Sequence, residues 1–314
     1  MPVLNEARHL RDAVLAVLTQ SYDGPLEIVL ALGPSTDDTD AVASQLAQDP
    51  RVHTVRNPSG RTPDALNAAI AECSSQSEFI IRVDGHALLP PHYIATAIRI
   101  LQETGADNTG GVMAAEGTTP FECAVACAMR SPIGVGSAAF HTGGQAGPAA
   151  TVYLGAFRRA ALQRVGGYDP RFTRTQDWEM NHRIRSTGGL VWFTPELQVA
   201  YRPRGSVRAL ARQYFQYGYW RRIVMRTHGG TASVRYLAAP AMVVVCLLSA
   251  VLAGIWPSLI VIPGFYLIGA IVAGCWIGAS RGLATMLRVP VALITMHWAW
   301  GVGFLSSWRA LRPR

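Results

Sequence analysis

The first two hundred residues alternate between short apolar runs and longer amphipathic segments. The β-branched apolar runs predict strands at 26–32, 51–55, 79–83 and 151–154. Apolar residues at helical spacing predict helices between them, at 6–19, 37–47, 62–72 and 92–103. This alternation is typical of an α/β fold with a doubly wound, mostly parallel sheet, in which ligands bind beyond the carboxyl ends of the strands.

The amino-terminal segment departs from this pattern. It opens with MPVLNEARHL, and no apolar run precedes its predicted helix. A doubly wound domain ordinarily begins with a strand that leads into such a loop. We therefore expect the first strand to be missing, either because the protein lacks it or because Met1 is an internal methionine of a longer chain. We favour the second explanation.

Three uncharged segments occupy the last third of the chain, at 236–256, 259–279 and 289–308. A helix as long as the first would span about 31 Å, roughly the thickness of a hydrocarbon core. We therefore predict a transmembrane region over 236–308 with two to three spans. The third segment carries His297, Trp298 and Trp300 in its middle. Because Trp prefers membrane interfaces, a re-entrant or interfacial course is the alternative for this segment.

Composition supports a division into a water-soluble part and a membrane part. The chain is 50% apolar, only 15% charged and has a mean hydropathy of +0.19. All 28 basic residues are Arg, and the residues after Glu196 include thirteen Arg and no acid. This excess adjoins the first apolar segment, where Arg would meet anionic headgroups. We therefore predict a lipid bilayer as a partner and exclude nucleic acid.

The segment at 201–235 carries eight Arg, and within it 206–226 interleaves Arg with aromatic residues at helical spacing. This pattern predicts a basic, amphipathic interfacial helix. With Arg281 and Arg288 before the third apolar segment, both Arg-rich flanks are expected to be cytoplasmic. The chain is thus predicted to be a multi-pass plasma-membrane protein with a cytoplasmic catalytic domain. The predicted domains are 1–200, 201–235, 236–308 and a basic tail at 309–314.

Four short motifs occur in order in the first domain. They are PVLNE (Pro2–Glu6), GPSTDDT (Gly33–Thr39), VDGH (Val83–His86) and QDWE (Gln176–Glu179). With the longer stretches NPSGRTPDALNAAIA, TVYLGAFRR and ARQYFQYGYW, the set resembles glycosyltransferase family 2, in particular its membrane-bound branch of succinoglycan biosynthesis glycosyltransferases. The resemblance covers about residues 2–235. It implies a GT-A fold and inverting transfer of a sugar from a nucleotide-diphosphate donor.

The resemblance implies a divalent cation, Mn²⁺ or Mg²⁺, that neutralises the diphosphate leaving group. The family pattern is Asp-x-Asp, and this chain has Asp84-Gly85-His86 after a predicted strand. Asp84 is the expected metal ligand, and His86 would favour Mn²⁺. The structural alternatives are a turn aspartate at the strand end and an ordinary loop histidine.

An inverting transfer also needs a base for the acceptor hydroxyl, and the resemblance places it at Asp177 in QDWE. The alternative for Asp177 is a helix N-cap, with Glu179 and Arg183 in a surface pair.

Nucleotide recognition departs from the family pattern, because Leu32 and Gly33 stand where Asp-Gly or Asp-Asp is usual. The base of the donor therefore stays open, with UDP as the default. The resemblance assigns nucleotide-sugar binding to Pro2, Asn5, Glu6, Asp37, Arg61, Asn67 and Asp84.

The acceptor side is assigned to Tyr153, Gly155 and Arg158. The sequence thus predicts a membrane-anchored inverting glycosyltransferase in polysaccharide or cell-envelope glycan synthesis, with a lipid-linked or membrane-presented saccharide as acceptor. Two alternatives stay open: a polyprenyl-phosphate sugar synthase, and a non-catalytic membrane subunit that keeps the fold.

Overall fold

The structure is a computed structural model that describes residues 1–308 and 311. It divides into two compact units. The α/β unit comprises Met1–Ala114 and Gly143–Tyr201, and the helical unit comprises Ala115–Thr142 and the chain from Arg202 onward. The basic tail predicted at 309–314 lies outside the described residues, apart from Leu311.

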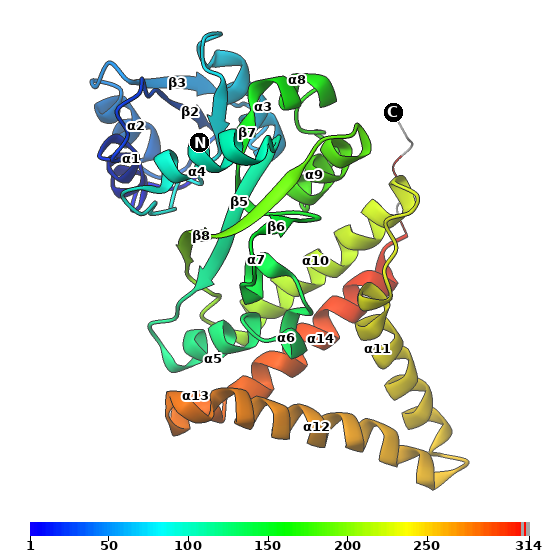
Figure 1. Ribbon diagram of the computed structural model, residues 1–314. Coiled ribbons are helices and arrows are strands. Elements are labelled where there is room, and N and C mark those ends of the chain that lie inside the picture. Colours follow the sequence, from blue (N-terminus) through cyan, green and yellow to red (C-terminus); the bar gives the residue numbers. More distant parts are fainter. Residues whose placement is uncertain (309–310, 312–314) are drawn as a thin grey trace. The chain divides into compact units, whose positions relative to one another are not determined.

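A parallel three-stranded sheet in the order β1-β2-β3 forms one part of the α/β unit (Figure 1). Its strands are β1 (Pro2–Val3), β2 (Ile28–Leu32) and β3 (Val52–Arg56). The helices that alternate with them are α1 (Leu10–Leu18), α2 (Thr39–Leu46) and α3 (Thr62–Glu72). These elements confirm the predicted strand–helix alternation. Helix α1 begins later than predicted, because the N–H groups of His9 and Leu10 both donate to the Glu6 carbonyl in a turn.

A five-stranded sheet in the order β4-β7-β5-β8-β6 forms the rest of this unit. Its strands are β4 (Phe79–Ile81), β5 (Asn108–Ala115), β6 (Gly147–Pro148), β7 (Tyr153–Arg158) and β8 (Val191–Tyr201). The associated helices are α4 (Tyr93–Thr104), α8 (Arg159–Val165) and α9 (Gln176–Ser186). The β4–β7, β5–β7 and β6–β8 pairs are antiparallel, so antiparallel pairs stand beside the predicted parallel ones.

The first strand, which we expected to be missing, is present but only two residues long. It pairs with Ala31 and Leu32. The α-amine of Met1 is buried and donates to the Val29 carbonyl at 2.8 Å, and this burial lowers its pKa to about 6. A cavity of about 520 Å³ lies between β2 and β4, with Met1 in its wall.

Two glycines explain why the sequence did not predict β5. A Cβ at Gly110 would lie 2.5 Å from the Tyr153 carbonyl oxygen, and one at Gly111 would lie 1.7 Å from that of Leu197. The flanking strands therefore approach the backbone of β5 so closely that only glycine fits, and glycine carries no strand signal. Strand β8 does carry one, because buried and exposed residues alternate from Leu197 onward.

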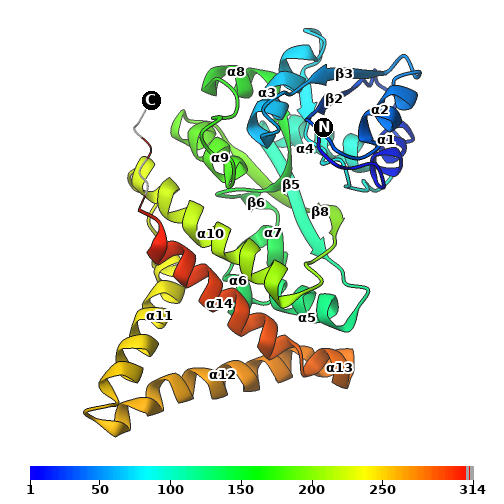
Figure 2. The same cartoon turned by 180° about the vertical axis from the view of Figure 1, so that it is seen from behind.

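The helical unit has short helices in Ala115–Thr142, and after Arg202 it has four long helices and one short one among the described residues (Figure 2). The short ones are α5 (Pro120–Met129), α6 (Pro132–Val135), α7 (Ala139–Thr142) and α13 (Leu283–Met286). The long ones are α10 (Val207–Thr227), α11 (Val234–Leu252), α12 (Val261–Gly278) and α14 (Val289–Ser306). Helix α10 is the predicted amphipathic helix, and both views show α14 running beside it.

Helices α10 and α14 meet backbone to backbone through glycines. A Cβ at Gly218 would lie 2.0 Å from the Trp300 carbonyl oxygen, and one at Gly303 would lie 2.1 Å from that of Phe215. Arginines of α10 also cap the carboxyl end of α14. Arg222 donates to the carbonyls of Phe304 (3.0 Å) and Leu305 (2.8 Å). The two helices thus form one packed pair.

Three helical stretches are long and apolar enough to cross a membrane: Val234–Leu252, Pro257–Arg281 and Leu283–Ser306. They match the three predicted segments and confirm a membrane-associated chain. The first two stretches expose large apolar side chains, among them Val251, Phe265 and Trp276, each more than 70% exposed. Such surfaces are stable in lipid and costly in water.

Candidate active site

A pocket of about 300 Å³ opens in the α/β unit where β1 and β4 end. Residues predicted to bind the donor or the cation line it: Pro2, Glu6, Asp84 and His86. Arg82, Arg174 and Gln176 line it as well, and Gln176 is the first residue of α9. Strand ends and a helix start thus converge at one site, which is where α/β sheets bind ligands.

A buried arginine joins the two principal candidate carboxylates. Arg82 lies just after β4 and its side chain is only 9% exposed. Its Nε and Nη2 donate to Oδ1 of Asp84 at 3.1 and 2.9 Å, and its Nη1 donates to Oδ1 of Asp177. Burial opposes the charge of Arg82, but Asp177 and Asp84 outweigh it and raise the pKa of Arg82 well above its ordinary value.

This arrangement leaves each carboxylate with one oxygen for other chemistry. The hydrogen bonds from the Arg82 guanidinium to these two carboxylates go to Oδ1 of Asp84 and to Oδ1 of Asp177. The Asp84 side chain is 21% exposed and that of Asp177 is 38% exposed, so both are accessible to a ligand. A shared guanidinium therefore fixes the spacing and orientation of two partly exposed acids.

Asp177 lies in the first turn of α9 and is not the N-cap of that helix. The N-cap position is Thr175, whose side chain makes no capping bond and whose backbone is left-handed, with φ of 57°. A non-glycine residue in this region is strained, and such strain often accompanies functional sites. Two further non-glycine residues of the α/β unit with positive φ are Asn5 and Leu154, both within or beside predicted site segments.

His86 and Glu6 form a second polar pair in the pocket. Nδ1 of His86 lies 2.7 Å from Oε1 of Glu6, and the His86 side chain is 54% exposed. This pair brings the VDGH segment to the PVLNE segment, and the assignment of both to donor binding stays a prediction. Within residues 1–308 and 311, no group of three His, Cys, Asp or Glu side chains is close enough to hold a metal. A cation here would need ligands from its substrate in addition to Asp84 and His86.

The side chains of Asn5 and Asp37 form hydrogen bonds between the first two motif loops. Asn5 Oδ1 accepts from the Thr36 N–H at 2.8 Å, and Asp37 Oδ2 accepts from the Ala7 N–H at 3.2 Å. Asp37 also accepts from the N–H and hydroxyl of Thr39, and these bonds lower the pKa of Asp37. The structure thus uses both side chains to shape the loop beside Glu6, and neither lines the pocket.

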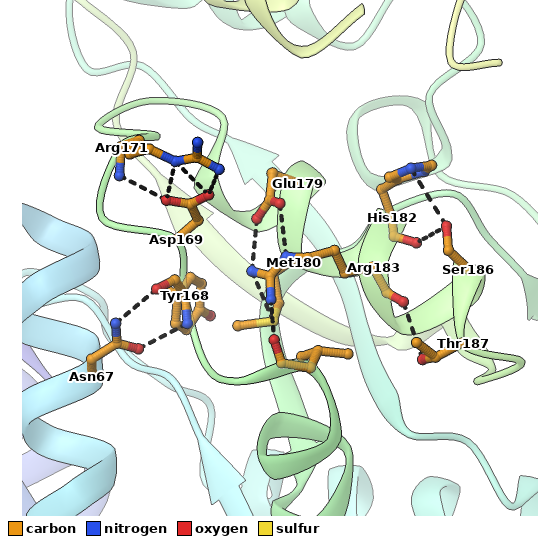
Figure 3. A network of polar contacts seen from close by, with 11 residues as sticks. Asn67, Tyr168, Asp169, Arg171, Glu179, Met180, His182, Arg183, Ser186 and Thr187 are labelled. Atoms are coloured by element: carbon orange, nitrogen blue, oxygen red, sulfur yellow. Dashed lines mark hydrogen bonds and ion pairs between the residues drawn. The ribbon is translucent and has the colours of Figure 1, made fainter. Parts of the chain in front are cut away.

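Arg61 and Asn67 are engaged by other parts of the α/β unit. Arg61, the residue before α3, pairs with Asp64 at 2.6 Å. Asn67 forms two bonds with the Tyr168 backbone, donating to its carbonyl at 2.7 Å and accepting from its N–H at 2.8 Å (Figure 3). Their assignment to donor binding stays a prediction.

An ion pair between Glu179 and Arg183, whose carboxylate is buried, holds helix α9 in place just after Asp177. Arg183 donates to both carboxylate oxygens of Glu179 at 2.7 Å, and the Glu179 side chain is 1% exposed (Figure 3). Arg183 also donates to the Val165 carbonyl at the end of α8. The alternative for Asp177 had this pair at the surface; its carboxylate is instead buried, and the Arg183 side chain, 20% exposed, holds α9 against α8.

The residues assigned to the acceptor side spread along β7. The Gly155 carbonyl accepts from the Arg82 N–H at 3.0 Å, so β7 supports the Arg82 site directly. Burial and the charge of Asp84 raise the pKa of Tyr153 well above its ordinary value. Arg158 is at the far end of the strand, where it binds the carbonyls of Ala106 and Leu101. The structure therefore brings Gly155 and Tyr153 near Asp84 and leaves Arg158 apart.

Arg82 is the residue of the candidate site that sequence reasoning missed. It interrupts the apolar run FIIRV, and a buried arginine requires a charged partner. An Asp two residues later was the signal that could have found it.

Comparisons with known proteins place the chain among glycosyltransferases. The sequence pattern described as Glycosyl transferase family 2 matches residues 1–166. The chain is 32% identical over 314 residues to the succinoglycan biosynthesis protein ExoA of Rhizobium meliloti (strain 1021), covering 99% of this chain and 93% of that protein.

Solved structures show the same fold at low identity. The mannosyltransferase PcManGT from Pyrobaculum calidifontis, in complex with GDP-Man and Mn²⁺, is 21% identical, with a TM-score of 0.59 over 97% of this chain and 85% of that one. S. aureus TarS 1–349 in complex with UDP is 13% identical, with a TM-score of 0.52 over 97% of this chain and 89% of that one.

Proposed function

The chain belongs to glycosyl transferase family 2, and from this premise we propose that it transfers one sugar from a nucleoside-diphosphate donor to a lipid-linked saccharide at the membrane. The observation that carries the proposal is the Arg82 link between Asp84, which lines the donor pocket, and Asp177, at the start of α9. One buried guanidinium thereby couples the group that would bind the leaving diphosphate to the group that would activate the acceptor.

The donor is proposed to occupy the pocket of about 300 Å³ between the PVLNE and VDGH segments. The family relationship, the ExoA similarity and the fold shared with proteins solved with GDP-Man and with UDP support a nucleotide sugar as ligand. Leu32 and Gly33 leave the choice of nucleotide base open.

A divalent cation is proposed to bind at Asp84 with His86. A carboxylate and an imidazole suit Mn²⁺, and both line the same pocket. When bound, the cation would neutralise the charge that develops on the leaving diphosphate. Arg82 holds Oδ1 of Asp84 and leaves Oδ2 for this role.

Asp177 is proposed to act as the general base. Its Oδ2 takes the proton of the acceptor hydroxyl while the hydroxyl oxygen of the acceptor bonds to the anomeric carbon of the donor. The bond from the anomeric carbon to the diphosphate oxygen breaks, and the nucleoside diphosphate leaves with the electron pair. Attack opposite the leaving group inverts the configuration. Arg82 keeps Oδ1 of Asp177 bonded and so fixes the carboxylate during the step.

The membrane arrangement fits an acceptor carried by a lipid. The exposed apolar surfaces of α11 and α12 support membrane insertion, and the eight Arg between residues 202 and 235 support a cytoplasmic position for that flank. Helix α14 packs along α10, and α10 is polar and Arg-rich. This packing supports an interfacial or re-entrant course for the third apolar segment, which contains α14.

A donor screen tests this function. The full chain in lipid nanodiscs would be incubated with UDP- and GDP-linked sugars, Mn²⁺ and a lipid extract, and release of nucleoside diphosphate would be measured. We expect the wild type to turn over one donor and Asp84→Ala to lose this turnover. Asp12→Asn, a variant at an exposed position, is the control and should keep the wild-type turnover. Turnover that survives in Asp84→Ala, or no donor binding by the wild type, would refute the assignment.

A further inference from the structure

One arginine of the donor pocket has no charged partner in the part of the chain that the structure describes. The other charged or titratable side chains that line this pocket form two pairs, Arg82 with Asp84 and His86 with Glu6. Arg174 lines the same pocket and is exposed, and its guanidinium forms no hydrogen bond or ion pair with any described residue. Its positive charge is therefore available to a ligand that enters the pocket.

The backbone on both sides of Arg174 is held in place. Phe172, two residues earlier, is fully buried, and helix α9 begins at Gln176, two residues later. Between them, the left-handed Thr175 donates its hydroxyl to the Arg174 carbonyl at 2.6 Å and makes no capping bond to α9. Because the segment is anchored at both ends, a ligand that binds Arg174 does not have to order a loop, and this lowers the entropic cost of binding.

The second guanidinium of the pocket, that of Arg82, is engaged by the protein itself. Its Nε and Nη2 donate to Asp84, its Nη1 donates to Asp177, and its side chain is only 9% exposed. The charge of Arg82 is thus already balanced by carboxylates. An anion that enters the pocket would therefore find its arginine partner in Arg174, whose planar N–H groups suit the oxygens of a phosphate.

The position of Arg174 in the chain identifies the phosphate that it contacts. Arg174 lies three residues before Asp177, the proposed base, which acts at the anomeric carbon of the donor. The terminal phosphate of the donor is the one that is bonded to this carbon. When that bond breaks, its electron pair stays on the phosphate oxygen, so the terminal phosphate gains negative charge during the reaction.

We propose that Arg174 donates hydrogen bonds to the terminal phosphate of the donor and stabilises the charge that develops there. Arg174 keeps its proton throughout the step, since an arginine stays charged at neutral pH. This inference rests on the proposed function, which places a nucleoside-diphosphate sugar in the pocket. It adds a residue outside the four motifs to the donor site.

Nucleotide binding tests this role without catalysis. The full chain in phosphatidylcholine nanodiscs with Mn²⁺ would be titrated by calorimetry with UDP, GDP, UMP and GMP. For the base that the wild type binds, we expect Arg174→Gln to weaken binding of the diphosphate about tenfold or more and to leave that of the monophosphate within about twofold. Arg174→Lys keeps the charge but not the planar fork, so its loss should be smaller.

Arg8→Gln is the matched control. Arg8 is an exposed arginine of the same unit, its side chain bonds to none of the described residues, and it does not line the pocket. This variant loses the same charge and should bind both nucleotides as the wild type does. The midpoint of thermal unfolding should be unchanged in Arg174→Gln, because an exposed side chain without a bond is removed.

Three results would overturn the role of Arg174. The first is unchanged binding of the diphosphate in Arg174→Gln. The second is an equal loss for the diphosphate and the monophosphate, which would remove the terminal phosphate as the partner. The third is an equal loss in Arg8→Gln, which would reduce the effect to the overall charge of the unit. A wild type that binds none of these nucleotides would refute the proposed function as well, whereas the three results above leave it standing.

Discussion

The guanidinium of Arg82, at the end of β4, is hydrogen-bonded to the carboxylate of Asp177, at the start of α9. The Arg82 side chain is 9% exposed and that of Asp177 is 38% exposed, so a buried cation supports a partly exposed acid. The same guanidinium holds Asp84. A single side chain thereby joins two motifs that lie far apart in the sequence.

Removal of Arg82 should therefore affect both stability and activity. Arg82→Met leaves two carboxylates without their partner, and we expect a loss of about 3 kcal/mol in unfolding free energy, since breaking a buried pair is costly. Thermal unfolding and donor turnover would be measured together. The control is Arg56→Met, which breaks an exposed pair with Asp40 and should cost about 1 kcal/mol or less. Equal effects in the two variants would contradict a central role for Arg82.

The contact between α10 and α14 should tolerate no side chain at Gly218. A methyl group there would lie 2.0 Å from a backbone oxygen of α14, which cannot move aside as a side chain does. Gly218→Ala should lower the stability of the helical unit by about 1–3 kcal/mol, as overpacking does. Gly264→Ala in α12 meets no neighbour within 4 Å and serves as the control. The midpoints of thermal unfolding in detergent would decide, and equal midpoints would contradict the close packing.

His141, at the end of α7, should make stability depend on pH. Desolvation lowers its pKa to about 4, from the ordinary histidine value of 6.5. Between these values the unfolded chain binds a proton that the folded chain does not, so stability falls as the pH drops from about 6.5 to about 4. The loss should approach about 3 kcal/mol at the lower end.

Unfolding midpoints at about pH 7 and about pH 5 would test this. The wild type should lose more stability between the two pH values than His141→Gln, which cannot titrate. An identical pH dependence in both proteins would show that the folded chain protonates His141 as readily as the unfolded chain does.

An element of the fold could be predicted from the sequence where its own segment has an apolar periodicity. Apolar periodicity predicts strands such as β2 and helices such as α3. Gly110 and Gly111 concealed β5, because close packing against neighbouring strands demands residues without side chains. The antiparallel partners of β7 also depend on contacts between distant segments, which periodicity does not encode.

The candidate site was predictable where residues close in sequence define the chemistry. Asp84 and His86 were found from one motif, and the structure brings them to the same pocket as Glu6 and Pro2. The role of Arg82 depends on Asp177, a residue on another element, and no local pattern reveals that partnership. Asn67 was assigned to donor binding from its motif, but in the structure its side chain bonds to the Tyr168 backbone. The motif alone did not predict these bonds.

The most direct test of the account is the Asp177→Asn variant, measured for both sugar transfer and donor binding. Asparagine keeps an oxygen for Arg82 but cannot take a proton, so transfer should fall by about 10²–10⁴-fold while the donor Kd stays within about twofold. Asp12→Asn, at the surface, should change neither quantity. Transfer that persists in Asp177→Asn at the wild-type rate would contradict the account, because the acceptor would then need no base at this position.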